Sequence, residues 1–91
     1  MTASNYRVTV IVRPLDEVVD PEGDAIELGL RQLGFDGVAH VRSGKVIEIV
    51  VSAADADHAR GLAAEMSEKL LANPLIERFD IEVGQAPVIP G

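Results

Sequence analysis

The chain has 91 residues, contains no cysteine, and carries a net charge of −7 from 8 Lys and Arg against 15 Asp and Glu. A chain of this length forms one small domain that buries only about 60 to 65% of its unfolded surface, so association with another chain would add stability. The acidic balance argues against nucleic acid and anionic membranes as partners, and the absence of cysteine excludes disulfides, thiolate nucleophiles and cysteine-ligated zinc. We expect a cytoplasmic, soluble protein, since neither a basic leader nor a bilayer-spanning apolar run is found.

The first predicted elements are a strand and a helix. Residues 6–12 alternate between apolar and polar side chains, which is typical of a strand with one buried face. Asp20 is expected to cap a helix that begins at Pro21, and Gly34 to end it in the left-handed conformation. Leu28 lies almost opposite the apolar stripe of this helix and should be exposed. The stripe consists of Ile26, Gly29, Leu30 and Leu33.

Two β-rich runs, 38–42 and 46–51, follow on either side of a Ser-Gly pair and predict a hairpin. A three-residue loop ending at Gly44, with this glycine left-handed, turns the apolar side chains of the second run toward the core. It also places His40 beside Glu48. A two-residue loop would reverse the faces of the second run, and we prefer the longer loop because it gives His40 a polar neighbour.

A second helix is predicted after the hairpin. Ser52, followed three residues later by Asp55, indicates its start, and Asn73-Pro74 breaks it. Its apolar stripe consists of Ala59, Leu62, Ala63, Met66 and Leu70. Residues 76–83 then alternate as a last strand, and the proline- and glycine-containing tail at 84–91 should be irregular.

The resulting order βαββαβ predicts an α+β fold, a two-layer split βαβ sandwich. Its four-stranded, mostly antiparallel sheet would carry two helices on one face, with residues 1–83 as a single domain. The opposite face would be bare, with Ile11, Val46 and Val50 exposed, and we expect copies of the chain to associate through it. The charged residues around these three are Arg7, Glu48, Arg78 and Asp80.

Candidates for chemistry are few. His40 with Glu48 could form a general base, but a surface pair is the better interpretation. His58 lies near Asp55 at a predicted helix start, where acidic residues usually complement the helix dipole. The acidic run at 16–24 could attract Mg²⁺, although helix-start electrostatics explain most of it. No serine has a neighbouring base, so we predict no catalytic residue, no metal ligand and no cofactor-binding residue in this chain.

Four short blocks, in order and at consistent spacing, resemble a known family. They are Val19-Asp20-Pro21-Glu22-Gly23, Leu33-Gly34, Val41-Arg42-Ser43-Gly44-Lys45 with Glu48 after it, and Leu70-Leu71-Ala72-Asn73-Pro74-Leu75-Ile76-Glu77. In this combination the chain resembles the small, PurS-type subunit of phosphoribosylformylglycinamidine (FGAM) synthase. The resemblance extends over residues 6–83, and the tail carries no part of it.

The resemblance implies an accessory subunit in purine biosynthesis, at the step that converts formylglycinamide ribonucleotide (FGAR) to FGAM with ATP and glutamine. A large synthetase subunit would bind ATP, Mg²⁺ and the ribonucleotide, and a glutaminase subunit would release ammonia. The small subunit, usually dimeric, would bridge the two and assist ammonia transfer. It implies no catalytic residue in this chain.

We therefore expect interface or structural roles, and two other classes of function stay open. A ligand-sensing module would bind an amino acid between paired domains of this fold, and a small dimeric ferredoxin-like enzyme would need a pocket around His40 or His58. The residues expected at contacts or turns are Ile11, Leu28, Arg42, Gly44, Lys45, Val46, Glu48, Val50, Asn73, Pro74 and Glu77.

Overall fold

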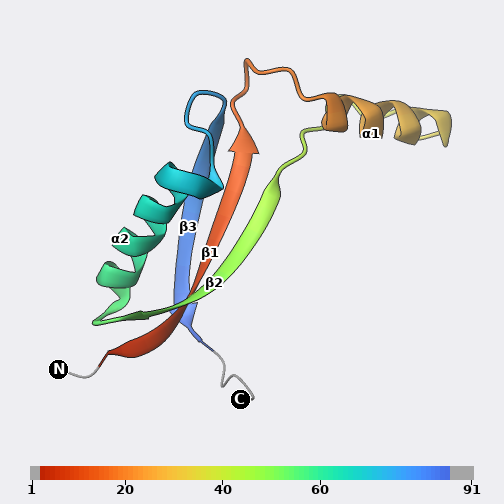
Figure 1. Ribbon diagram of the computed structural model, residues 1–91. Helices are drawn as coiled ribbons and strands as arrows, with labels where there is room; N and C mark the ends of the chain where they lie inside the picture. Colours follow the sequence, from red (N-terminus) through yellow and green to blue (C-terminus); the bar gives the residue numbers. More distant parts are fainter. Residues whose placement is uncertain (1–2, 87–91) are drawn as a thin grey trace.

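The computed structural model describes residues 3–86, which form one antiparallel sheet and two helices. In chain order the elements are strand β1 (Ser4–Pro14), helix α1 (Pro21–Gln32), strand β2 (Lys45–Ala53), helix α2 (Ala56–Met66), a π-helical turn η1 (Ser67–Leu71) and strand β3 (Glu77–Gln85). The strand order is β2-β1-β3, with β1 in the centre and antiparallel to both neighbours (Figure 1). The predicted α+β class is confirmed.

The register of the sheet separates a core face from a bare face. Ile11 pairs with Val46 of β2 and Asp80 of β3, so these three side chains lie in one row. Because side chains alternate along a strand, Val10 points the other way and is fully buried, whereas Val46 is 64% exposed. We call the second surface the bare face. It carries Arg7, Thr9, Ile11, Arg13, Val46, Glu48, Val50, Arg78, Asp80 and Glu82.

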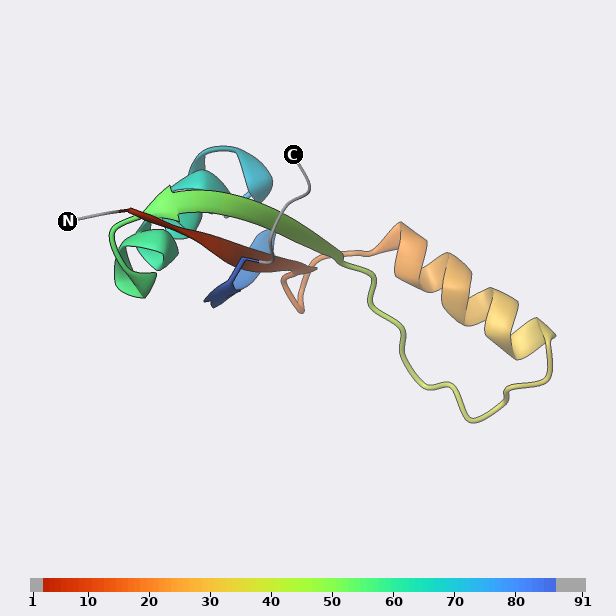
Figure 2. The same cartoon turned by 90° about the horizontal axis from the view of Figure 1, so that it is seen from below.

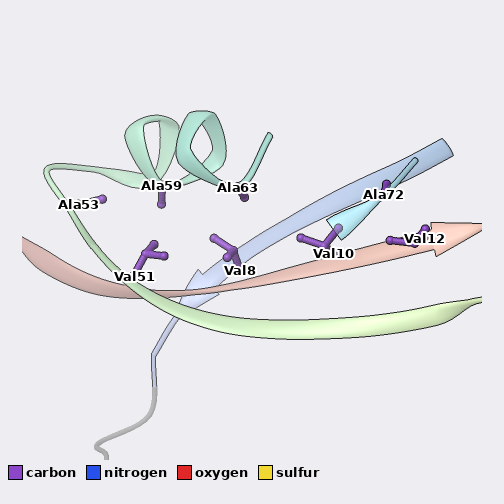
Figure 3. Packing of buried hydrophobic residues seen from close by; sticks show 8 residues of the cluster. All are labelled: Val8, Val10, Val12, Val51, Ala53, Ala59, Ala63 and Ala72. Atoms are coloured by element: carbon purple, nitrogen blue, oxygen red, sulfur yellow. The ribbon is translucent and has the colours of Figure 1, made fainter. Parts of the chain in front are cut away.

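Helix α2 covers the core face. Its Ala59 and Ala63 are fully buried, and their small side chains let the helix approach the sheet closely. Figure 3 shows these two alanines above the central valines of the sheet, with Ala72 near Val12 at one end. The fully buried part of the core is small and aliphatic, as the composition indicates, and partly buried Tyr6 and Phe79 pack against it. The buried apolar residues are Val8, Val10, Val12, Val51, Ala53, Ala59, Ala63 and Ala72.

Helix α1 projects away from the sheet (Figures 1 and 2). The longest dimension of the molecule is therefore 56 Å, and its radius of gyration is 17.1 Å, against about 12 Å for a compact chain of this length. Within α1 only Gly23 is buried, and Leu33 just beyond it is 75% exposed. The prediction of two helices on one face is wrong, since α2 alone covers the sheet. We call α1 and its return segment, residues 33–44, the arm.

The predicted strand at 38–42 does not form, so the sheet has three strands within the described residues instead of four. Its residues return along α1 toward the sheet (Figure 2). The predicted loop is also wrong, because Gly44 is not left-handed. This glycine instead lies so close to the carbonyl oxygen of Val12 that a Cβ atom would not fit. Without the hairpin, His40 has no strand partner and the expected pairing with Glu48 is absent.

The ends of the helices agree in part with the sequence analysis. Helix α1 begins at Pro21 after its cap Asp20, and Gly34 follows it with φ of 99°, both as predicted. Helix α2 is capped by Asp55, so a start at Ser52 is wrong. It ends at Met66 and continues as η1, before the Asn-Pro pair is reached.

Strand β3 extends to Gln85, two residues beyond the predicted end at Val83. Of the rest of the expected irregular tail, Ala86 has no regular structure, and residues 87–91 lie outside the described part of the chain. Within residues 3–86, neither helix has the length and apolar character that a bilayer crossing needs.

Candidate functional site

The base of the arm is held by the carboxylate of Asp20, which is only 9% exposed. Its Oδ1 accepts a hydrogen bond from the Gly23 N–H at 3.1 Å, and its Oδ2 accepts one from the Ser43 N–H at 2.6 Å. Asp20 therefore caps α1 and also ties the helix to the chain that returns to β2. The hydrogen bonds from Ser43 and Gly23, with the nearby charge of Arg42, hold the pKa of Asp20 below its ordinary value of 3.8.

Arg42 fixes the loop between β1 and α1. Its Nη1 donates to the carbonyl oxygen of Val18 at 2.8 Å, and its Nη2 donates to that of Leu15 at 2.6 Å. The hydroxyl of Ser43 adds a hydrogen bond to the Glu22 carboxylate at 2.5 Å. These contacts direct residues 42–44 toward the loop and α1, which explains why the preceding residues do not turn back along β2.

Gly23 allows the two sides of this base to meet. A Cβ atom there would collide with the carbonyl oxygen of Val41 and the Asp20 carboxylate. The base of the arm is thus a close-packed joint made by two of the sequence blocks that resemble the PurS family. We call Asp20, Gly23, Arg42, Ser43 and Gly44 the arm joint.

A further block lies against the same region. Asn73 donates its N–H to the Glu77 carboxylate at 2.7 Å and accepts from the Leu75 N–H at 3.1 Å, which stabilises the turn containing Pro74. The Leu15 N–H donates to the carbonyl oxygen of Ile76 at 2.9 Å and joins this turn to the loop that Arg42 holds. A cavity of about 210 Å³ lies between the joint and the turn. It is lined by Asp20, Glu22, Ser43, Gly44, Lys45 and Glu77.

A larger cavity of about 370 Å³ lies beside the joint, where the bare face meets the arm. Four basic residues line it, which is half of the eight Lys and Arg in the chain, against one carboxylate from Asp16. Its remaining lining is largely apolar and includes Ile11 and Val46. We call this cavity the cationic pocket. Its basic residues are Arg13, Arg42, Lys45 and Arg78.

The expected contact residues occupy four places. Ile11, Val46, Glu48 and Val50 lie on the bare face, and Leu28 lies on the arm with 59% of its surface exposed. Arg42 and Gly44 belong to the arm joint, and Lys45 follows directly after it. The turn contains Asn73, Pro74 and Glu77. The structure therefore brings the last two groups together, and the roles of all of them in contacts with other chains remain predictions.

The two histidines lie in different parts of the molecule. The N–H of His58 donates to Asp55 at 2.7 Å, and its Nδ1 accepts from the Ala54 N–H at 3.0 Å, so the interpretation as a helix start is confirmed. His40 is exposed on the return segment of the arm, away from Glu48. Over residues 3–86, no group of three or more histidine or carboxylate side chains could hold a metal ion.

Two features of the site are not predicted from the sequence. Arg13 and Arg78 lie opposite each other in the sheet, and the Ser43 N–H donates to Asp20. The first could have been found, since Arg13 is the last but one residue of β1 and Arg78 is the second residue of β3, and antiparallel pairing places them opposite each other. The second could not, because the bond from Ser43 to Asp20 is made by a backbone N–H, which carries no signal in the sequence.

Comparison with known proteins identifies a single family. Residues 7–85 match the model of the PurS family, described as phosphoribosylformylglycinamidine (FGAM) synthase. The PurS subunit of this synthase from Synechocystis sp. is 44% identical over 77 residues, which cover 85% of this chain and 75% of the relative. The structure of Bacillus subtilis PurS is 39% identical with a TM-score of 0.78, covering 88% of this chain and 99% of that one. A chain in the structure of PurLQS from Thermotoga maritima is 29% identical with a TM-score of 0.79, covering 87% and 96%.

Proposed function

Because this chain belongs to the PurS family of FGAM synthase subunits, we propose that it is a non-catalytic accessory subunit of that synthase in de novo purine biosynthesis. It bridges a synthetase and a glutaminase subunit and assists the transfer of ammonia during the ATP- and glutamine-dependent conversion of FGAR to FGAM. The relative in the PurLQS structure supports this role.

One observation of this chain carries the proposal. Three of the blocks that resemble the family converge on the arm joint and the neighbouring turn, where their polar groups bind one another. Side chains used in this way position a surface and leave few groups for a reaction. These hydrogen bonds hold the exposed helix α1 in a fixed position relative to the sheet. Such a helix suits a subunit that contacts other chains.

We place the cofactors of the reaction on other chains. ATP, Mg²⁺ and the ribonucleotide would bind the large synthetase subunit, and glutamine would be hydrolysed on the glutaminase subunit. This assignment follows from the family, and we expect the assembly to work in the cytoplasm.

We further propose that two copies of this chain associate through their arms. An isolated helix of about 12 residues is marginally stable in water, and α1 has few contacts within its own chain. Leu28, Leu33 and Phe35 are 59%, 75% and 58% exposed, so the arm offers apolar surface on more than one side. The outer edge of β2 in a second copy would also give residues 38–42, which have the composition of a strand, the strand partner they lack.

The bare face is the alternative surface through which two copies would associate. This alternative rests on Ile11, Val46 and Val50, of which Val46 and Val50 are 64% and 40% exposed. We favour the arm because its apolar residues belong to a helix that needs packing, whereas the sheet is already covered on its core face by α2.

Reconstitution of the synthase tests the bridging role. The synthetase and glutaminase subunits of one organism are assayed with and without this chain, with either glutamine or ammonia as the nitrogen source. We expect a loss of glutamine-dependent turnover without the chain and a smaller loss of ammonia-dependent turnover. Turnover that is unchanged with both nitrogen sources would refute the proposal.

Calorimetry separates this function from a ligand-sensing module. The isolated chain is titrated with glutamine and other amino acids. Saturable binding by the isolated chain would favour the sensing module instead of the bridging subunit.

A further inference from the structure

The cationic pocket differs in charge from the rest of this acidic chain. The sequence has 15 acidic and 8 basic residues, yet four of the basic ones gather around a single cavity of about 370 Å³. Such a concentration raises the local potential for anions even when the net charge of the protein is negative. The pocket is therefore a candidate site for a group of opposite charge.

Two of the four cations hold only weak internal partners. Arg13 contacts Asp80 at 3.1 Å and Arg78 contacts Asp16 at 3.8 Å. All four side chains of these pairs are more than half exposed, and exposed ion pairs contribute little to stability. An incoming carboxylate can replace either internal partner at small cost.

The other two cations are at the arm joint. Both terminal nitrogens of Arg42 donate to backbone carbonyls, so its charge is fixed in place beside the pocket. Lys45 is exposed at the start of β2 and is free to turn toward a ligand. The pocket thus combines one positive charge held by two hydrogen bonds with three that are exposed to solvent.

The shape and lining of the pocket favour a protein partner. Its Arg13 and Arg78 side chains are 51% and 53% exposed, and Val46 is 64% exposed, so the lining does not enclose a small molecule. Ile11 and Val46 add an apolar patch beneath the charges. A surface segment that carries Asp or Glu beside an apolar side chain matches both features.

We propose that the cationic pocket is the docking site for an acidic segment of one of the two partner subunits of the synthase. The proposal rests on the bridging function and adds the surface and the chemistry of one contact. The partner's carboxylates would pair with Arg13, Arg78 and Lys45 while its apolar side chain covers Val46.

Charge reversal in the assembled system tests the proposal. Arg13→Glu/Arg78→Glu is compared with Arg60→Glu/Lys69→Glu, which makes the same change of charge on the α2 side of the sheet. Binding of each variant to the purified synthetase subunit and to the purified glutaminase subunit is measured by surface plasmon resonance. We expect the pocket pair to weaken binding to one of the two subunits at least about tenfold, and the control pair to change it less than about threefold.

Salt and a second variant provide independent readouts. Raising NaCl from about 50 to about 300 mM should weaken binding of the wild-type chain and have a smaller effect on the pocket variant. Lys45→Glu tests the same pocket at a single exposed position, and circular dichroism verifies that each variant is folded. The proposal would be overturned if the two double variants weakened binding equally. It would also be overturned if Arg13→Glu/Arg78→Glu and Lys45→Glu both bound with the affinity of the wild type.

Two further outcomes have distinct meanings. Saturable binding of inorganic phosphate to the isolated chain, lost in the pocket variant while the complex still forms, would reassign the pocket to a small anion. If the wild-type chain binds neither subunit, both the bridging function and this contact are overturned. If the wild-type chain binds and the pocket variants bind equally well, only the contact is overturned.

Discussion

Helices α1 and α2 have nearly the same length, 12 and 11 residues, yet they differ in what surrounds them. Ala59 and Ala63 of α2 are fully buried against the sheet. In α1 only a glycine is buried, and that glycine lies at the joint and not on a packed face. Helix α2 completes the fold of its own chain, and α1 is left exposed, where the proposed dimer would pack it against a second copy.

The largest expected effect comes from changing the apolar surface of the arm. Ile26→Asp/Leu33→Asp should raise the dissociation constant of the homodimer about 100-fold or more, because two side chains that would be buried in the interface become charged. Sedimentation at a series of protein concentrations measures the change. Gln32→Asp, which adds a charge at a polar position of the same helix, serves as the control and should keep the oligomer. An unaltered oligomer in the double variant would exclude the arm as the interface.

Val46→Glu distinguishes the arm from the bare face. If the arms hold the dimer together, this variant sediments as the wild type does and loses only the contact with a partner subunit. If the bare faces meet, it dissociates the dimer. Sedimentation of this variant beside the arm variant therefore decides which region holds the second copy.

The second largest effect concerns the packed helix. Ala63→Leu should destabilise the fold by about 1–3 kcal/mol, because there is no room for the larger side chain between α2 and the sheet. Ala25→Leu makes the same change on the exposed arm and should alter stability by less than about 0.5 kcal/mol. Denaturant titration measures both. Equal losses in the two variants would contradict the difference between the helices.

Alanine substitutions at two glycines of α1 should have smaller effects on the stability of the arm, in opposite directions. Gly23→Ala should weaken the joint, because the new methyl group would collide with the Val41 carbonyl oxygen. Gly29→Ala has open space around it and should favour the helix by about 0.5–1 kcal/mol. Amide exchange in α1 measures each effect, and the same direction of change in both would contradict the close packing at Gly23.

The sequence predicts those features that depend on nearby residues. The alternation in β1 and β2 gives the correct faces, and Asp20, Pro21 and Gly34 give the correct ends of α1. Each of these signals acts within a few residues of the chain. They are therefore readable before any tertiary contact is known.

The position of the arm depends on distant contacts and could not be predicted in the same way. Residues 38–42 have the composition of a strand, and no local signal shows that Arg42 and Ser43 bind a loop more than 20 residues earlier. The apolar stripe of α1 likewise indicates burial without indicating which chain supplies the cover. A family resemblance based on these blocks identifies the function but not the geometry.

The smallest expected effect is a pH dependence at the joint. Asp20→Asn keeps an oxygen for one backbone N–H and loses the charge and the second acceptor, so the variant should be less stable than the wild type at about pH 7. Since folding lowers the pKa of Asp20, its contribution is complete above the ordinary value of 3.8 and is lost as pH falls through the lower folded value. The difference between wild type and variant should therefore shrink below about pH 4. Asp24→Asn, in the same turn of α1, is the matched control.

Thermal unfolding at a series of pH values, with amide exchange of α1 measured near neutral pH, checks this expectation. The exchange data should place the loss in the arm and leave the amides of β1 unaffected, because the bonds of Asp20 join α1 to Ser43 and do not reach the sheet core. A gap between wild type and Asp20→Asn that stays constant as the solution is acidified would mean that the charge of Asp20 does not stabilise the joint. In that case the hydrogen-bond geometry of the cap alone would hold the arm. The difference between the packed helix α2 and the exposed helix α1 would then be due to packing and not to the charge of Asp20.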